Sequence, residues 1–306
     1  MEYKNNYFYK QAKWMLQIMP MVAKEKCFAL KGGTAINFYI RNMPRLSVDI
    51  DLTYLPLKPR DISLLDISEA LNRISNQIKK IFPQSKIISS KAAGGRTKKI
   101  FVHNQEVQVT IEPNEILRGS VFECNDKKLS AEVEKEFEIS GKIQVLSIED
   151  LYAGKICAAL DRQHPRDLFD VKLLLDNEGI TNKIRKAFVI YLASHDRPMH
   201  ELLSPKLKNI KELYEKEFFT MTNIPTTCLE LEDVRLRMIT EIQNNMTNDE
   251  RKFLISLKRM QPDWSLTGIP GIESLPSIQW KLANLKKMSV EKHYASLEKL
   301  QKILGT

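Results

Sequence analysis

Hydrophobic and polar positions alternate in several short segments of the first half of the chain. In residues 46–54 every second position is apolar and the positions between them are polar. A period of two is typical of a β-strand with one buried face. Short apolar or alternating runs predict four further strands, over residues 28–30, 86–90, 97–103 and 107–112.

Other segments have the period of a helix. From Ile67 to Phe82 apolar residues recur every three or four positions, with Ser63 as the predicted N-cap and Pro83 as the stop. Similar patterns predict helices over residues 1–26, 34–41, 147–160 and 166–177.

Beyond residue 198 the strand pattern disappears. The elements predicted there are helices over residues 206–219, 229–244, 249–260 and 277–303. A chain of 306 residues is also longer than a single core usually holds. We therefore predict an α/β (α+β) domain with a mixed sheet over residues 1–197 and an all-α helical bundle over residues 198–306.

The composition is that of a folded protein with a basic surface. Apolar residues make up 43% of the chain and charged residues 28%, which excludes a wholly disordered or fibrous chain. The formal net charge is +9, and residues 1–200 carry 31 Lys and Arg against 24 Asp and Glu. A basic surface favours a polyanion, such as nucleic acid or a nucleotide phosphate, as the partner.

The sequence lacks several common functional motifs and a membrane-spanning run. The four cysteines lie far apart without a C-x-x-C pair, which argues against a disulfide framework or a structural zinc ion. H-E-x-x-H, nucleophile-elbow and Walker A motifs are also missing. No run reaches the roughly 18 apolar residues of a membrane helix. We therefore expect no membrane partner, and we expect the protein to be located in the cytoplasm. We expect the three tryptophans to be core anchors and not base-stacking platforms: Trp14, Trp264 and Trp280.

The strongest local signal is a pair of glycines followed by a pair of acids. Gly32 and Gly33 stand between a predicted strand and a helix, where the backbone can approach a phosphate closely. Asp49 and Asp51 are two residues apart on the next strand, so both carboxylates are expected to leave one face, about 6–7 Å apart at Cα. Two carboxylates so placed can hold Mg²⁺, which in turn binds a polyphosphate.

Each half of this signal also has a simpler interpretation. A glycine pair is often only a turn, and an Asp-x-Asp pattern on a strand is often a solvated face. The combination favours metal and nucleotide binding, because two like charges beside the buried Ile50 repel each other and do not stabilise the strand.

A second group of charged residues lies on both sides of a predicted break between two helices. Lys155 precedes the apolar run 156–160, and a lysine in such surroundings needs a carboxylate or a phosphate as its partner. Asp167 is the candidate carboxylate. The structural alternative is that Arg166 and Asp170, four residues apart, pair across one helical turn.

Two further features are open to a functional and a structural interpretation. Glu112 ends a predicted strand on its polar face and is the candidate third acid, which a site with two metal ions needs; it is equally explained as an acid at a strand end. A predicted hairpin carries five basic residues that suit a nucleic-acid backbone or the protection of an edge strand: Lys86, Lys91, Arg96, Lys98 and Lys99.

These motifs, in this order, resemble those of the AbiEii/AbiGii toxin family of nucleotidyltransferases, which belongs to the DNA polymerase beta-like nucleotidyltransferase superfamily. The resemblance covers roughly residues 25–200 and rests on four segments: Leu30–Ala35, Arg45–Leu52, Lys155–Ala159 and Pro165–Asp170. Members of the family are toxins of bacterial toxin–antitoxin or phage-defence systems, and some transfer nucleotides to the 3′ end of tRNA.

The resemblance implies a role for each motif residue. The implied nucleotide-binding residues are Lys31, Gly32, Gly33, Thr34, Arg45, Ser47 and Arg166. The implied ligands of Mg²⁺, as one ion or two, are Asp49, Asp51 and Glu112. The implied catalytic residues are Asp49, Asp51, Lys155 on the triphosphate, and Asp167 as the acidic partner of Lys155.

We therefore expect a Mg²⁺-dependent nucleotidyltransferase that moves NMP from an NTP to an acceptor hydroxyl. The expected acceptor is the 3′ end of a tRNA. A cognate antitoxin is a candidate partner. Two alternatives stay open. One is transfer to a protein hydroxyl, and the other is a non-catalytic module that binds nucleotides or nucleic acid without releasing pyrophosphate.

Overall fold

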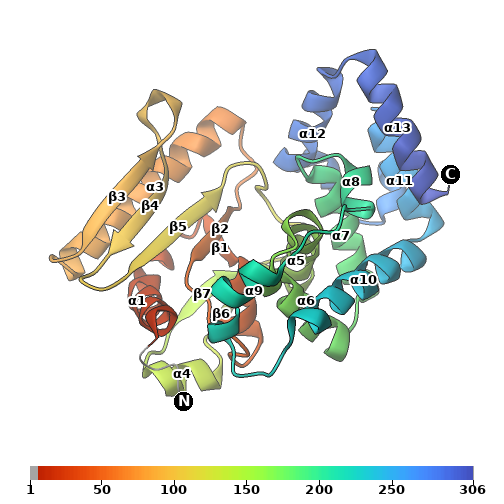
Figure 1. Ribbon diagram of the computed structural model, residues 1–306. Coiled ribbons are helices and arrows are strands. Elements are labelled where there is room, and N and C mark those ends of the chain that lie inside the picture. Colours follow the sequence, from red (N-terminus) through yellow and green to blue (C-terminus); the bar gives the residue numbers. More distant parts are fainter. Residues whose placement is uncertain (1–5, 306) are drawn as a thin grey trace. The chain divides into compact units, whose positions relative to one another are not determined.

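The computed structural model describes residues 6–305, and its chain forms two compact units (Figure 1). Unit 1 comprises Met1–Ser147 and Phe218–Pro225, and unit 2 comprises Ile148–Glu217 and Thr226–Thr306. The chain therefore enters unit 2 at Ile148, returns to unit 1 for one short segment, and ends in unit 2.

Unit 1 is built on a seven-stranded mixed sheet, as the alternating patterns predict. The strand order is β3-β4-β5-β2-β1-β7-β6. The pairs β1–β7 and β2–β5 are parallel, and the other neighbours are antiparallel. The strands are β1 Phe28–Lys31, β2 Ile50–Tyr54, β3 Lys86–Lys91, β4 Thr97–His103, β5 Gln108–Asn114, β6 Asn125–Lys128 and β7 Lys142–Val145.

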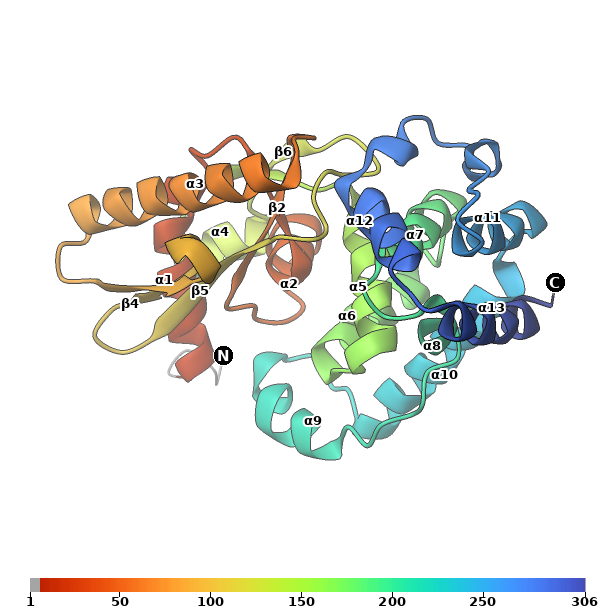
Figure 2. The same cartoon turned by 90° about the horizontal axis from the view of Figure 1, so that it is seen from above.

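Two long helices cover the sheet of unit 1 (Figure 2). Helix α1 (Tyr7–Val22) and helix α3 (Arg60–Ile81) pack against each other, α3 against β4 and α1 against β5. Trp14 of α1 is buried, with its indole N–H donating to the Val102 carbonyl at 3.2 Å, so it is the core anchor that the sequence predicts. The shorter elements are α2 Gly32–Ala35, a π-helical turn Ile36–Ile40, α4 Ala131–Phe137, and single 3₁₀ turns at Ala93–Gly95 and Phe219–Met221.

Unit 2 is entirely helical within the part that the structure describes. Helix α5 lies at its centre and contacts α6, α7, α8 and α10. The helices are α5 Ile148–Arg162, α6 Pro165–Asn177, α7 Asn182–Ser194, α8 Met199–Leu203, α9 Lys211–Glu217, α10 Cys228–Asn245, α11 Asn248–Lys258, α12 Pro276–Lys286 and α13 Val290–Leu304, with 3₁₀ turns at Trp264–Thr267 and Ile272–Ser274. Between residues 6 and 305, none of the helices combines the length and the apolar character that crossing a bilayer requires.

The division between the units lies well before the boundary predicted at residues 197 and 198. The last strand ends at Val145 and the first helix of unit 2 begins at Ile148. Helices α6 and α7 pack on α10, α11 and α12, so their apolar faces belong to the helical core and not to the sheet. By its contacts, the segment 148–197 is therefore part of the helical unit.

Two smaller predictions are wrong, and one strand was not predicted. Ser63 is not an N-cap, because α3 begins at Arg60 and the Ser63 hydroxyl donates to the Lys58 carbonyl at 3.1 Å. The single helix predicted over 277–303 is two helices, α12 and α13, and Ser289 caps the second. Strand β6 is polar and exposed at all four positions, so its sequence has no alternation from which a strand could be predicted.

Candidate active site

The predicted pair of acids lies at the start of the central strand of unit 1. Asp51 is the second residue of β2, and Asp49 directly precedes this strand. Asp51 pairs with Lys31 of β1 on one side and with Glu112 of β5 on the other. Directly paired residues leave the same face of a sheet. The strand register therefore brings three of the predicted site residues into one row.

Two glycines adjoin this row and leave room for its side chains. Gly32 has a φ of +71°, and a Cβ atom there would lie 2.5 Å from Oδ2 of Asp51. A Cβ atom on Gly33 would lie 2.6 Å from Nη2 of Arg45 and 3.1 Å from Oγ of Ser47. Because real Cβ atoms do not approach so closely, a side chain at either position would displace one of these groups.

Thr34 ties the segment before β2 to the first turn after β1. Its hydroxyl donates to the Asp49 carbonyl at 2.5 Å and lies 2.9 Å from Oγ of Ser47. Thr34 is buried with 1% exposure, where a hydrogen bond is costly to lose. The backbone of Asp49 is therefore fixed beside the glycines, as a shared site requires.

Arg45 places a buried guanidinium beside the same glycines. The residue is 3% exposed, and its Nη1 donates to the Leu46 carbonyl at 2.8 Å. Its backbone forms a bridge with Thr222, and the Leu46 N–H donates to the Met221 carbonyl at 2.7 Å. The returning segment of unit 1 therefore holds Arg45 in place. A guanidinium is always charged and suits phosphate oxygens.

Glu112 lies beside Asp51 in the sheet but does not join a cluster of acids. Its Oε2 lies 3.2 Å from Nζ of Lys99 on β4. Across residues 6–305, no three His, Cys, Asp or Glu side chains are grouped so that they could hold a metal ion. The structure thus does not assemble Glu112 with Asp49 and Asp51 into one set of ligands, and the third-acid role stays a prediction.

The remaining donors fit one divalent cation of the Mg²⁺ type. Asp49 and Asp51 offer carboxylate oxygens, which hard cations prefer as ligands. Gly32, which has no side chain, leaves Oδ2 of Asp51 unblocked. The chemistry of these residues therefore suits the metal that the sequence predicts.

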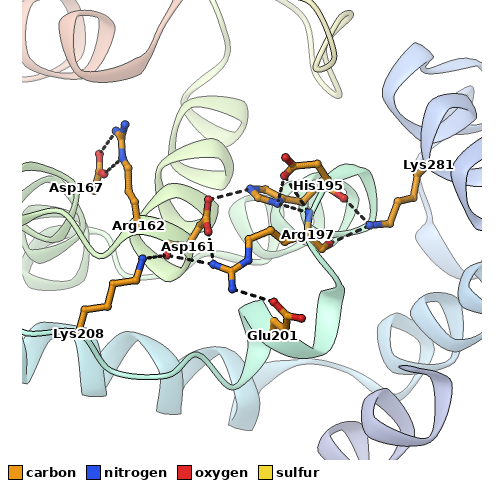
Figure 3. A network of polar contacts seen from close by, with 9 residues as sticks. Asp161, Arg162, Asp167, His195, Arg197, Glu201, Lys208 and Lys281 are labelled. Atoms are coloured by element: carbon orange, nitrogen blue, oxygen red, sulfur yellow. Dashed lines mark hydrogen bonds and ion pairs between the residues drawn. The ribbon is translucent and has the colours of Figure 1, made fainter. Parts of the chain in front are cut away.

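In unit 2, Lys155 of α5 is buried against two aspartates of α6. Its Nζ lies 2.8 Å from Oδ1 of Asp167 and 3.0 Å from Oδ2 of Asp170. Arg162 also binds Asp167, with Nε–Oδ2 at 2.5 Å and Nη2–Oδ1 at 2.9 Å (Figure 3). The predicted pairing of Lys155 with Asp167 is confirmed. We call these four residues the lysine cluster.

The lysine cluster balances two cations against two buried anions. Asp167 is 1% exposed and Asp170 is fully buried. Burial would raise the pKa of Asp167, but Lys155 and Arg162 outweigh it and hold this pKa well below its usual range. Asp170 follows Asp167 by three residues, a spacing that places both on one helix face; this spacing is the sequence signal for the second partner of Lys155.

Arg166 is the second residue of α6, and His164 caps this helix. Nδ1 of His164 accepts from the Arg166 N–H at 3.1 Å. Oε2 of Glu217 lies 3.1 Å from Nε2 of His164 and 3.4 Å from Nη2 of Arg166. Burial, followed by the charge of Arg166, lowers the pKa of His164. The nucleotide-binding role of Arg166 stays a prediction.

The chain is similar to known proteins in its sequence and in its fold. A family model described as nucleotidyl transferase AbiEii toxin, type IV toxin–antitoxin system, matches residues 14–284. A search of curated proteins gives no match. Among solved structures the chain is similar to MenT4, a nucleotidyltransferase toxin from Mycobacterium tuberculosis H37Rv, with a TM-score of 0.62 and 13% identity over 91% of this chain and 93% of that chain. At this identity the likeness shows the fold.

Proposed function

We propose that this chain, which belongs to the AbiEii family of nucleotidyltransferase toxins of type IV toxin–antitoxin systems, moves NMP from an NTP to the 3′-terminal hydroxyl of a tRNA. The chain is thus a toxin-type nucleotidyltransferase, and its family implies an NTP substrate and an antitoxin partner. Three parts of the proposal go beyond the family: the tRNA acceptor, Mg²⁺ as the bound ion, and the cytoplasm as the location of the protein.

The observation that carries the proposal is the contact between Gly32 and the carboxylate of Asp51. This contact places the glycine turn after β1, which suits phosphates, beside strand β2, whose carboxylates suit a metal ion. Mg²⁺ held by Asp49 and Asp51 would neutralise the α-phosphate and lower the pKa of the acceptor hydroxyl. In this proposal the two aspartates are the ligands that set the position of the metal ion's positive charge.

The backbone and Arg45 bind the phosphates in this proposal. The N–H groups of Gly33 and Thr34 open a helical segment that runs to Ile40, and such N–H groups favour anions. Arg45 adds a fixed positive charge that costs no reorganisation when the triphosphate binds. The missing side chain of Gly33 keeps the guanidinium close to the backbone.

Lys155 is assigned to the triphosphate. An ammonium has three N–H donors, and Asp167 and Asp170 accept two of them. In this proposal the third N–H donates to a phosphate oxygen, where the ammonium stabilises charge that builds up on the departing pyrophosphate. Asp167, held by Arg162, acts as the positioning residue for this ammonium.

Basic residues on the β3–β4 hairpin favour a nucleic-acid acceptor over a protein. Lys86 and Lys98 are exposed, and neither has an ion-pair partner among residues 6–305. Lys91 donates to Oγ1 of Thr97 at 2.7 Å. Unpaired surface lysines suit a phosphodiester backbone.

Replacing Gly32 with alanine is expected to lower transfer at least about tenfold, because its Cβ atom would push the Asp51 carboxylate aside. Gly179→Ala is the matched control: Gly179 has a φ of +69° with nothing within 4 Å of a Cβ atom. Both variants should lose about 1–2 kcal/mol of stability from backbone strain, measured by urea unfolding. Equal activity in the two variants would argue against a role for the Gly32–Asp51 contact.

The acceptor is tested by incubating the wild-type protein with Mg²⁺ and each of the four α-labelled NTPs, in the presence of purified total tRNA or of cell protein. We expect label on tRNA, from one NTP in preference to the others, and its loss after removal of the 3′-terminal nucleotide by nuclease. Label on protein alone would overturn the tRNA acceptor but leave the nucleotidyltransferase assignment intact.

A further inference from the structure

Strands β3, β4 and β5 of unit 1 bury one face of the sheet and leave the other face open. Helix α3 packs on β4, and four alternating residues of β4 and β5 on that side are fully buried: Ile100, Val102, Val109 and Ile111. The side chains that the three strands place on the opposite side are all exposed or half-buried. Figure 1 views the strands from this opposite side, with α3 behind β4. We call it the open face.

The middle of the open face is apolar and aromatic. Strand register places Ile88 of β3, Phe101 of β4 and Thr110 of β5 in one row across it. Ile88 is 43% exposed, and Phe101 is half-buried. Single exposed apolar residues are normal on a surface, but neighbouring ones indicate a binding site. An accessible aromatic ring on a sheet is suited to stack on a nucleobase.

A lysine lies on each side of this row. Lys99 precedes Phe101 by two residues on β4, and its Nζ lies 5.5 Å from the centre of the Phe101 ring. Lys86 precedes Ile88 by two residues on β3 and pairs with His103, two residues beyond Phe101. Lys86 is exposed and has no ion-pair partner among residues 6–305. Positive charges next to a stacking ring are the combination that binds a single nucleic-acid strand.

The open face continues into the row of the proposed metal site. Asp51 of β2 pairs with Glu112 of β5, and Oε2 of Glu112 lies 3.2 Å from Nζ of Lys99 on β4. Phe101 is therefore two strands and one row away from Asp51, which is about 12 Å from strand spacing and rise. Stacked nucleotides rise about 3.4 Å each, so a strand that ends at the metal reaches Phe101 within a few nucleotides.

A single strand fits the open face better than a duplex. In a duplex the bases stack on each other within the helix, so no base is free to stack on Phe101. An unpaired strand offers bases for Phe101 and Ile88 and, at the same time, phosphates for Lys86 and Lys99. The charge and the aromatic ring of this face therefore match one kind of partner.

We propose that the open face binds the single-stranded 3′ end of the RNA acceptor, with one base stacked on Phe101 beside Ile88 and with Lys86 and Lys99 on the phosphates. This inference rests on the proposed transfer to tRNA and adds the path of the acceptor. The terminal hydroxyl lies at the metal site on β2, and the preceding nucleotides cross the sheet from β5 to β3. The residues of the open face bind the acceptor and do not touch the reacting atoms.

The test measures binding of a short single-stranded RNA with the sequence of a tRNA 3′ end, labelled at its 5′ end, by fluorescence anisotropy. The buffer contains EDTA and no NTP, so no transfer takes place. We expect Phe101→Leu to weaken binding at least about fivefold, because it removes one base–aromatic stack. Tyr294→Leu is the matched control, since Tyr294 is a 62% exposed aromatic residue on α13 of unit 2, and it should bind like the wild type.

Lys86→Ala tests the phosphate contact separately. We expect binding to weaken at least about threefold at low salt, and the slope of log Kd against log salt concentration to fall by about 0.7, as for one phosphate contact on a single strand. Lys80→Ala, which removes an exposed lysine of α3, should change neither quantity. Lys86 is exposed, so this variant keeps the test decisive even if thermal unfolding shows that Phe101→Leu is not folded.

Three results would overturn the proposal. The first is a folded Phe101→Leu or Lys86→Ala variant that binds the RNA as well as its control does. The second is failure of the wild type to bind the single strand. The third is equally tight binding of a blunt-ended RNA duplex, since a duplex has no free base for Phe101.

Transfer assays distinguish a failure of this inference from a failure of the proposed reaction. We expect Phe101→Leu to raise the KM for tRNA at least about fivefold while kcat stays within about twofold. If the variant labels tRNA with an unchanged KM, the reaction stands and the open face is not its acceptor site. If the wild type labels only protein, the proposed acceptor is wrong and this inference is wrong with it.

Discussion

Asp51→Asn is expected to lower nucleotidyl transfer by about 10³-fold or more, with the fold unchanged. Loss of a metal ligand removes several kcal/mol of charge stabilisation in the transition state, and about 4 kcal/mol corresponds to about 10³-fold in rate. Asparagine has nearly the shape of aspartate, and it removes a negative charge that stands beside Glu112 in the sheet. Initial rates of transfer to tRNA and thermal unfolding measure the two effects.

Asp49→Asn should behave in the same way, since the metal needs both carboxylates. Asp61→Asn is the matched control, because Asp61 is an exposed acid in the first turn of α3, and should keep transfer within about twofold. Full activity in Asp51→Asn would show that this carboxylate does not bind the metal.

Lys155→Met is expected to cost stability as well as activity. The change removes the ammonium that lies 2.8 Å from Asp167 and 3.0 Å from Asp170, and both of these carboxylates are buried. Removing one partner of a buried ion pair typically costs about 3–5 kcal/mol. Urea unfolding of the full chain measures this loss. Lys172→Met, which removes an exposed ion pair to Asp176 on α6, should cost less than about 1 kcal/mol.

The double variant Lys155→Met/Asp170→Asn separates the structural role from the functional one. It removes one cation and one anion from the lysine cluster, so charge is again balanced between Arg162 and Asp167. We expect it to recover at least half of the lost stability while transfer stays at least about 10²-fold below the wild type. A stable double variant with wild-type activity would make Lys155 a purely structural residue.

Local patterns of the sequence predict the parts of the site that are close together in the chain or share a strand pair. The alternation around Ile50 identifies β2, and the glycines after a short apolar run identify the turn that follows β1. Antiparallel pairing of these two strands then places Gly32 beside Asp51. Lys155 and Asp167 were predictable because an apolar helix forces a lysine to find a partner.

Features that depend on packing between distant elements have no such local signal. Lys258 and Lys281 are buried only because different helices pack around them, and each looks like an ordinary surface lysine in its own segment. The apolar faces of α6 and α7 suit a sheet as well as a helical core, so the unit boundary follows only from what they pack against. Glu112 is similar: the sequence places it on a polar face, but its ion pair with Lys99 depends on strand register.

The most direct test is a crystal structure of the protein with Mg²⁺ and a non-hydrolysable NTP. We predict that Asp49 and Asp51 both ligate the ion and that phosphate oxygens accept from the N–H groups of Gly33 and Thr34 at about 3 Å. A triphosphate bound elsewhere, or the two carboxylates on opposite sides of the backbone with no shared ion, would contradict the account.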